Sequence, residues 1–168
     1  MEIKKIFWTM LTTAMIVLPI NAVADDEEDE TVKIVYQCDF PDVKRVHLML
    51  NTLGNVVKYY QKALVDFELN VVALGPCLQY VMKDFKGTGF AEKPYLHRGG
   101  PAGNGTLGRL DNLKQTAGDN LNVYACGNTM EKKDVKKAQL LDMAEVTPGG
   151  IIKIIELQRE GAAYVKIR

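Results

Sequence analysis

The sequence contains no serine and only two histidines among its 168 residues, and each scarcity excludes a class of chemistry. Without serine the chain has neither a Gly-x-Ser-x-Gly elbow nor a serine catalytic triad. His47 and His97 are not accompanied by carboxylates or cysteines at the spacing of metal ligands. The glycine-rich stretches also lack the strand, lysine and helix of a phosphate-binding loop. We therefore expect no metal ion and no cofactor.

Net charge is absent as well, because 21 lysines and arginines balance 21 aspartates and glutamates. A nucleic-acid-binding domain usually carries a basic excess, so we expect no nucleic-acid partner. The acidic residues are concentrated in the run DDEEDE at residues 25–30. A block of like charges repels itself and favours water, which predicts a solvated, disordered tail over residues 25–31.

No apolar run has the length of a typical membrane span, which needs about 20 residues. The apolar stretch near the N-terminus covers only residues 6–20, follows Lys4 and Lys5, and precedes Ala22-Val23-Ala24. A basic start, a short apolar stretch and a small-x-small site are typical of a secretory signal. We predict a cleavable signal peptide over residues 1–24, a periplasmic mature protein, and no membrane association after cleavage. An uncleaved membrane anchor is the alternative.

The rest of the chain, residues 32–168, alternates between strand and helix patterns in what we expect to be one domain. Repeated β-α units predict an α/β fold with three layers, α/β/α, around a mostly parallel sheet of about five strands. The expected strands are residues 31–37, 68–74, 121–125, 143–147 and 163–167, and the expected helices are 43–67, 77–85, 106–117 with Thr106 as its cap, 134–141 and 151–159.

Two glycine features stand out from this pattern. Gly54 lies inside the first expected helix, where glycine costs about 1 kcal/mol relative to alanine, so we expect a packing reason for it. Residues 86–105 form a long glycine-rich segment with little apolar content. A loop of this length in a compact domain is usually functional or disordered.

Each of the three cysteines, Cys38, Cys77 and Cys126, lies at or just beyond the end of an expected strand. If the strands are parallel, all three lie at the carboxyl edge of the sheet, where ligands collect in open α/β folds. An odd number of cysteines in an exported protein leaves at least one thiol free or bonded elsewhere. For Cys38 a buried or disulfide-bonded role is favoured over a reactive one, and a bridge to either Cys77 or Cys126 is open.

Cys126 is the cysteine that we favour as reactive. It precedes Gly127, which allows close backbone approach, and Asn128, a good helix cap. The positive end of a helix dipole lowers the pKa of a nearby thiol and raises its thiolate fraction. The alternative is a small hydrophobic side chain in the core.

The run Tyr124-Ala125-Cys126-Gly127-Asn128-Thr129-Met130 resembles the DsrE family of small sulfur-relay proteins. Supporting similarity lies in 33–37, 72–76, 146–151 and 158–164. The resemblance implies an α/β fold that assembles into homo- or hetero-oligomers, commonly trimers or hexamers. It also implies a cysteine that carries sulfane sulfur as a persulfide, a role that falls on Cys126, with Gly127, Asn128 and Thr129 shaping its pocket.

These observations predict a periplasmic sulfur-trafficking protein that exchanges sulfur with a donor or acceptor protein through Cys126. Cys77 or Cys38 would serve as a resolving thiol, and His97 or Arg98 in the long loop would stabilise the persulfide anion. The alternative is a non-catalytic oligomeric protein that binds a small ligand or metal ion at the same edge. Thiol–disulfide exchange is a third hypothesis, although the chain has no Cys-x-x-Cys.

Overall fold

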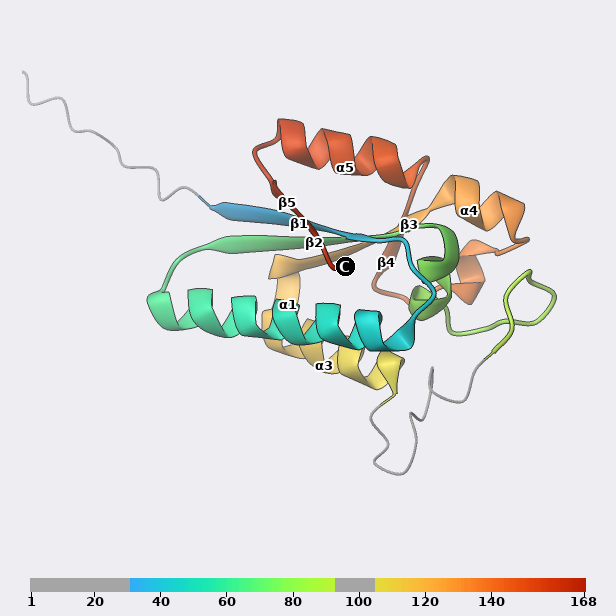
Figure 1. Ribbon diagram of the computed structural model, residues 1–168, viewed down its shortest axis with the longest axis horizontal. Helices are drawn as coiled ribbons and strands as arrows, with labels where there is room; N and C mark the ends of the chain where they lie inside the picture. The colour runs from blue at the N-terminus through green and yellow to red at the C-terminus, as the bar shows by residue number, and fades with distance from the viewer. Residues whose placement is uncertain (1–30, 93–104) are drawn as a thin grey trace, which may run out of the picture.

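The computed structural model describes residues 31–92 and 105–168, which fold around one parallel sheet (Figure 1). The five strands are ordered β4-β3-β2-β1-β5, and every neighbouring pair is parallel. The predicted fold class is therefore confirmed. The strands are β1 (Val32–Cys38), β2 (Phe67–Ala73), β3 (Leu121–Cys126), β4 (Ala144–Thr147) and β5 (Ala163–Lys166).

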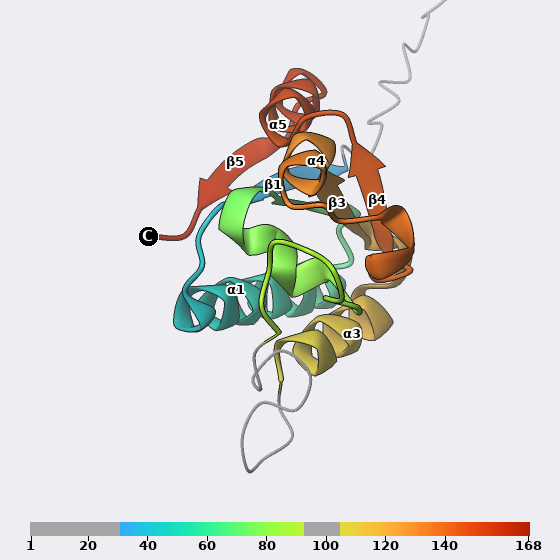
Figure 2. The ribbon, with the colours of Figure 1, turned by 90° about the vertical axis from the view of Figure 1, so that its right-hand side faces the viewer.

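Helices cover both faces of the sheet, as Figures 1 and 2 show. Helices α1 and α3 lie side by side on one face, α5 lies on the other, and α4 lies at the carboxyl edge. The helices are α1 (Val43–Ala63), α3 (Thr106–Ala117), α4 (Gly127–Lys132) and α5 (Gly150–Arg159), with 3-10 turns η1 (Gly75–Val81), η2 (Gly118–Asn120) and η3 (Lys137–Gln139).

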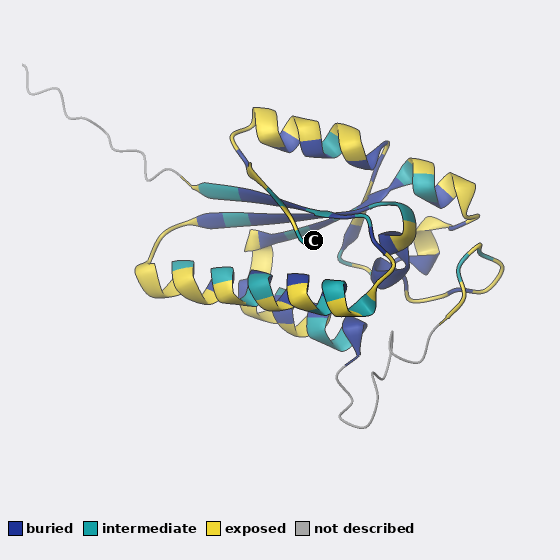
Figure 3. Cartoon of the chain, viewed as in Figure 1, coloured by how far each residue is buried: buried dark blue, intermediate teal, exposed yellow. Residues whose placement is uncertain are grey.

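The core is asymmetric, because the larger apolar cluster lies between the sheet and the α1/α3 layer. Figure 3 shows the strands mostly buried, whereas the outward sides of the helices are exposed. The smaller cluster, on the α5 face, consists of Val35, Val72, Ile154, Leu157 and Ala162. Side chains alternate between the two faces along each strand, so the register decides which cluster each residue joins.

Several local predictions of the helices were wrong. The short helix predicted for 77–85 forms only as the 3-10 turn η1, which ends at Val81 because Met82 has an extended backbone. The helix predicted for 43–67 ends at Ala63, because Leu64 adopts a left-handed conformation with φ 56° that closes the helix. The cap of α3 is Gly105, and the hydroxyl of Thr106 lies 3.0 Å from His47 Nε2 instead. Only η3 forms within the helix predicted for 134–141, because the backbone is extended at Lys136 and at Leu140, on either side of that turn. The packing reason expected for Gly54 is also absent, since a Cβ built there meets no described atom within 4 Å.

No helix in the described ranges is long and apolar enough to cross a membrane. The predicted signal peptide and most of the predicted acidic tail lie outside those ranges, as does the segment 93–104 of the long loop.

Candidate functional site

Cys126 ends β3 at the carboxyl edge of the sheet and is 5% exposed. Helix α4 begins at the next residue, so Cys126 itself occupies the cap position that the sequence had assigned to Asn128. Its neighbour Ala125 joins the core on the α1/α3 face, which directs Cys126 toward the α5 face. There it contacts the N-terminus of α5.

Backbone and hydroxyl donors surround the sulfur atom. The backbone N–H of Gly150 donates to Cys126 Sγ across 3.1 Å. Burial by itself raises the pKa of Cys126, but hydrogen bonds from the Thr129 side chain and from the backbone N–H groups of Gly150, Thr129 and Asn128 outweigh it, and the net pKa is lowered. These donors favour the thiolate form of Cys126, and no lysine or arginine of the described residues contributes to the lowered pKa.

The hydroxyl of Thr129 is itself held in place by the chain that follows β2. The backbone N–H of Gly75 donates to Thr129 Oγ1 across 2.9 Å. Because the oxygen accepts that bond, its own proton remains available to the sulfur of Cys126. Three segments distant in the sequence thus converge on one thiol: the start of η1, the β3–α4 junction and the start of α5.

Close backbone approach around the thiol requires glycine at two positions. A Cβ on Gly150 would lie 2.9 Å from Leu74 Cβ and 3.3 Å from Cys126 Cβ. A Cβ on Gly127 would lie 2.9 Å from the carbonyl oxygen of Thr147. Both distances are shorter than ordinary van der Waals contact, so any larger residue would push the three segments apart.

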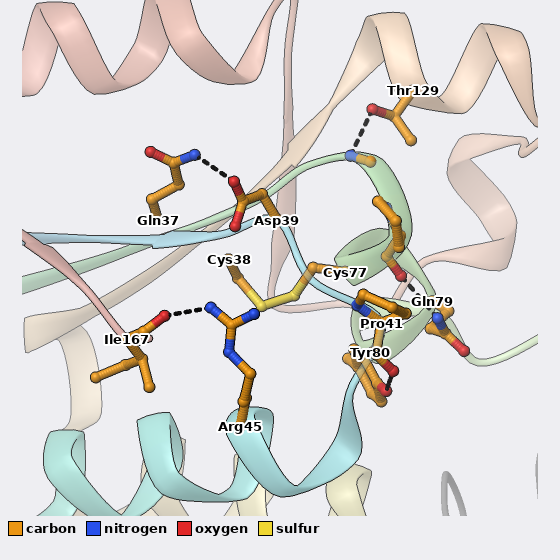
Figure 4. The surroundings of a disulfide bond; sticks show 12 residues. Gln37, Cys38, Asp39, Pro41, Arg45, Cys77, Gln79, Tyr80, Thr129 and Ile167 are labelled. Atoms are coloured by element: carbon orange, nitrogen blue, oxygen red, sulfur yellow. Dashed lines mark hydrogen bonds between the residues drawn. A yellow bond between two sulfur atoms is a disulfide. The ribbon is translucent and has the colours of Figure 1, made fainter.

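The other two cysteines form a disulfide, shown in Figure 4. The Cα atoms of Cys38 and Cys77 lie 5.6 Å apart, within the usual range for a bridge. Both residues are buried in the apolar cluster on the α1/α3 face, the face opposite to the one toward which Cys126 points. Of the two pairings that the sequence left open for Cys38, the structure contains the one with Cys77. A resolving role for either residue stays a prediction, and it requires this bond to be reduced first.

The histidine predictions have different outcomes. His47 lies on α1, which covers the face of the sheet opposite to the one toward which Cys126 points, and its Nε2 atom lies 3.0 Å from Thr106 Oγ1. His97 and Arg98 lie outside the described residues, so their predicted role at the persulfide is not placed. Within residues 31–92 and 105–168, no group of three or more histidine, cysteine or acidic side chains is arranged to hold a metal ion.

Sequence reasoning found Cys126, Gly127, Asn128 and Thr129 but missed two glycines. In the sequence, Gly150 and Gly75 belong only to the stretches 146–151 and 72–76 that support the family resemblance, with no role at the thiol. Their shared signal was available: each follows a parallel strand at the same edge as Cys126.

Comparison with known proteins identifies the family to which the site belongs. A model of the DsrE/DsrF-like family matches residues 61–167, which include Cys126 and the glycines around it. A solved structure of a protein of unknown function, MTH1491 from Methanobacterium thermoautotrophicum, is 21% identical with a TM-score of 0.60, covering 80% of this chain and 98% of its own. The YchN protein from E. coli is 14% identical with a TM-score of 0.48, covering 82% and 100% of the two chains. No curated protein sequence matches the chain.

Proposed function

The chain belongs to the DsrE/DsrF-like family, and membership of this family suggests a general role in sulfur relay. We propose that Cys126 carries sulfane sulfur as a persulfide. The observation that carries this proposal is the set of hydrogen-bond donors that lowers the pKa of a mostly buried thiol. A thiolate is the form that attacks a sulfane sulfur. A core thiol with no chemical role would need none of these donors.

The transfer takes place in two steps with no net oxidation or reduction. The Cys126 thiolate attacks the terminal sulfur of a donor persulfide R–S–SH. The new bond joins Cys126 Sγ to that sulfur, the donor S–S bond breaks, and R–S⁻ leaves while the proton stays on the transferred sulfur. A partner thiolate then attacks the terminal sulfur of Cys126–S–SH. A new S–S bond joins that sulfur to the partner, the S–S bond to Cys126 breaks, and Cys126 is again a thiolate.

The pocket residues have defined tasks in these steps. The N–H of Gly150 and the hydroxyl of Thr129 stabilise negative charge on Sγ before the attack and again after the sulfur leaves. Gly127 and Gly150 allow the backbone to approach closely enough for these contacts. The narrow access to Cys126, 5% exposed, limits the partner to a slender thiol or persulfide presented on an extended group.

That same low exposure favours one alternative, in which the pocket binds a small ligand and performs no sulfur transfer. In this case the donors around Cys126 Sγ would bind an anionic ligand, and Cys126 would stay an unmodified thiol. Loss of the thiol would then weaken binding only partly, whereas it would abolish sulfur loading completely.

The decisive experiment loads the purified protein with glutathione persulfide and measures intact mass after alkylation. We expect one added sulfur atom per chain, on the peptide that contains Cys126, removable by cyanide. Cys126→Ser should show no loading, while the matched variant Cys38→Ala/Cys77→Ala should load as the wild type does. Equal loading of wild type and Cys126→Ser would eliminate the proposal in favour of ligand binding.

We also propose that the mature protein starts at Asp25, lies in the periplasm and forms a homo-oligomer. The Cys38–Cys77 disulfide supports an oxidising compartment, since such bonds are rare where thiols are kept reduced. N-terminal sequencing of the periplasmic fraction tests the cleavage site. Light scattering of the mature protein distinguishes a trimer or hexamer from a monomer.

A further inference from the structure

The Cys38–Cys77 disulfide fixes the turn that leads from β2 into η1, residues 74–77, which we call the β2–η1 turn. Cys38 holds this turn at both ends. Its carbonyl oxygen accepts a hydrogen bond from the backbone N–H of Leu74 across 2.9 Å, and its side chain is bonded to Cys77. The backbone N–H of Cys77 also donates to the carbonyl oxygen of Leu74 across 3.2 Å. Gly75 lies between these two anchored residues, so its backbone is held from both sides.

Through Gly75 the β2–η1 turn also contacts the site of the free thiol. The N–H of Gly75 donates to Thr129 Oγ1 across 2.9 Å, and the Thr129 side chain is hydrogen-bonded to the sulfur of Cys126. Figure 4 shows the disulfide and the bond to Thr129 on the same short stretch of chain. A series of contacts therefore connects the disulfide, on the α1/α3 face, with the thiol that is directed toward the α5 face.

Leu74 gives the β2–η1 turn a second contact with the site. A Cβ on Gly150 would lie 2.9 Å from Leu74 Cβ, so the turn packs directly against the start of α5. The N–H of Gly150 is the group that donates to Cys126 Sγ across 3.1 Å. The turn therefore contacts two of the residues whose donors reach the sulfur, Thr129 and Gly150.

The hydroxyl of Thr129 depends on this support because a threonine in a helix has a competing choice. Its hydroxyl can turn and donate to a backbone carbonyl of the preceding turn. The N–H of Gly75 favours the orientation in which the oxygen faces the β2–η1 turn and the proton remains for the sulfur. If the turn moved away, this donor would be lost, and the pKa of the Cys126 thiol would rise because burial would be opposed by fewer hydrogen bonds.

We infer that the Cys38–Cys77 disulfide is a positioning element for Cys126, because it holds the β2–η1 turn where the Thr129 hydroxyl stays hydrogen-bonded to the thiol. The inference deepens the proposed function, and as a statement about sulfur transfer it rests on that function. The disulfide acts while it is intact, so no electron transfer is involved. Because Cys126 itself remains when the bond is removed, the final sulfur loading is unchanged, and what falls is the rate at which the thiol reacts.

The test measures the pH dependence of iodoacetamide modification in the purified protein. In the wild type the disulfide protects Cys38 and Cys77, and in Cys38→Ala/Cys77→Ala both thiols are absent, so Cys126 is the reacting cysteine in both proteins. We expect the variant to react roughly two- to tenfold more slowly at neutral pH, as for the loss of one hydrogen bond, with its profile shifted to higher pH. An equal rate with an unchanged pH profile overturns the inference.

The matched control for lost stability is Leu53→Ala. Leu53 is fully buried on α1, in the apolar cluster that also contains the disulfide, and its truncation destabilises the fold about as much as loss of the bridge. All variants are compared where circular dichroism shows them folded. Leu53→Ala should react with iodoacetamide as the wild type does. If it reacts as slowly as Cys38→Ala/Cys77→Ala, lost stability explains both results and the inference is wrong.

A double-mutant cycle tests whether the effect passes through Thr129. Thr129→Val should slow the modification of Cys126 in the wild type, but it should have little further effect where the disulfide is already absent. Fully additive effects would overturn the inference, because the bond and the hydroxyl would then act independently. None of these measurements uses sulfur transfer. Coupling without persulfide loading would therefore refute the proposed function alone, and loading without coupling would refute this inference alone.

Discussion

Cys38 and Cys126 end two strands of one parallel sheet at the same edge, yet they lie in different surroundings. Cys38 is fully buried on the α1/α3 face, bonded to Cys77 and packed in the larger apolar cluster. Cys126 is 5% exposed, directed toward the α5 face, and contacted by N–H and O–H donors. The register explains the difference, because Cys38 aligns through Ala73 with Ala125, one residue before Cys126.

This comparison teaches that burial alone does not decide the pKa of a thiol. Both cysteines are removed from water, and burial by itself raises the pKa of a free thiol such as that of Cys126. The environment of Cys126 differs because glycines let three backbone segments bring donors to the sulfur. The lowered pKa of Cys126 therefore comes from the junction around the cysteine and not from its depth.

Removing the disulfide should produce the largest effect on stability. The bridge spans a sequence separation of 39, for which the chain-entropy relation gives about 4 kcal/mol of stabilisation. We expect Cys38→Ala/Cys77→Ala to lower the free energy of unfolding by about this amount in urea denaturation. An unchanged urea midpoint would mean that the bridge constrains nothing in the unfolded chain.

Adding one methyl group beside Cys126 should be the next largest effect. Gly150→Ala places a Cβ 2.9 Å from Leu74 Cβ, which overpacks the junction. We expect a loss of about 1–3 kcal/mol in the free energy of unfolding. The control is Gly108→Ala in α3, where a Cβ meets nothing and the helix should gain up to about 1 kcal/mol. Equal effects at the two glycines would contradict the close approach at Gly150.

Thr129→Val removes the hydroxyl donor from Cys126 while nearly preserving side-chain volume. The pKa of the thiol should rise, so its alkylation rate at neutral pH should fall roughly three- to tenfold, as expected for one hydrogen bond. The pH dependence of iodoacetamide modification measures both quantities. Thr129→Ser keeps the hydroxyl and should restore the wild-type profile; a profile unchanged in Thr129→Val would show that the backbone donors suffice.

The smallest effect concerns stability against pH. The folded pKa of Cys126 lies below that of the unfolded chain, so the folded state binds fewer protons between the two values. The stabilising contribution is full above the unfolded pKa, near 8.5, and is lost as the pH falls through the folded pKa. Relative to Cys126→Ser, the wild type should therefore gain stability as the pH rises from 7 toward 9. A constant difference between the two proteins across this range would contradict a lowered pKa.

Much of the fold could be predicted from the sequence because periodicity and turn residues are local signals. The strand predicted for 121–125 matches β3 to within one residue, and the helix predicted for 106–117 matches α3. Helix lengths were predicted less well, because they depend on the conformation of single residues such as the left-handed Leu64 and the extended Lys136. Neither residue type signals such a break in a helix as glycine does.

The candidate site could be predicted only where it is continuous in the sequence. Cys126, Asn128 and Thr129 belong to one segment, so the motif revealed them together. Gly150 lies 24 residues from Cys126, and Gly75 lies 54 residues from Thr129. No local pattern connects residues so far apart, and only the strand order brings them to one place.

By itself the sequence determined the α/β class, the placing of three cysteines at one sheet edge, and a motif centred on Cys126, because these follow from periodicity and from the geometry of parallel strands. The tertiary structure decided which cysteines pair, which face each one joins, and which donors reach the free thiol. The physical reason is that pairing, burial and hydrogen bonding depend on distances between segments. Those distances are set by sheet register and by close packing at glycines, and neither is encoded in any single stretch of the chain.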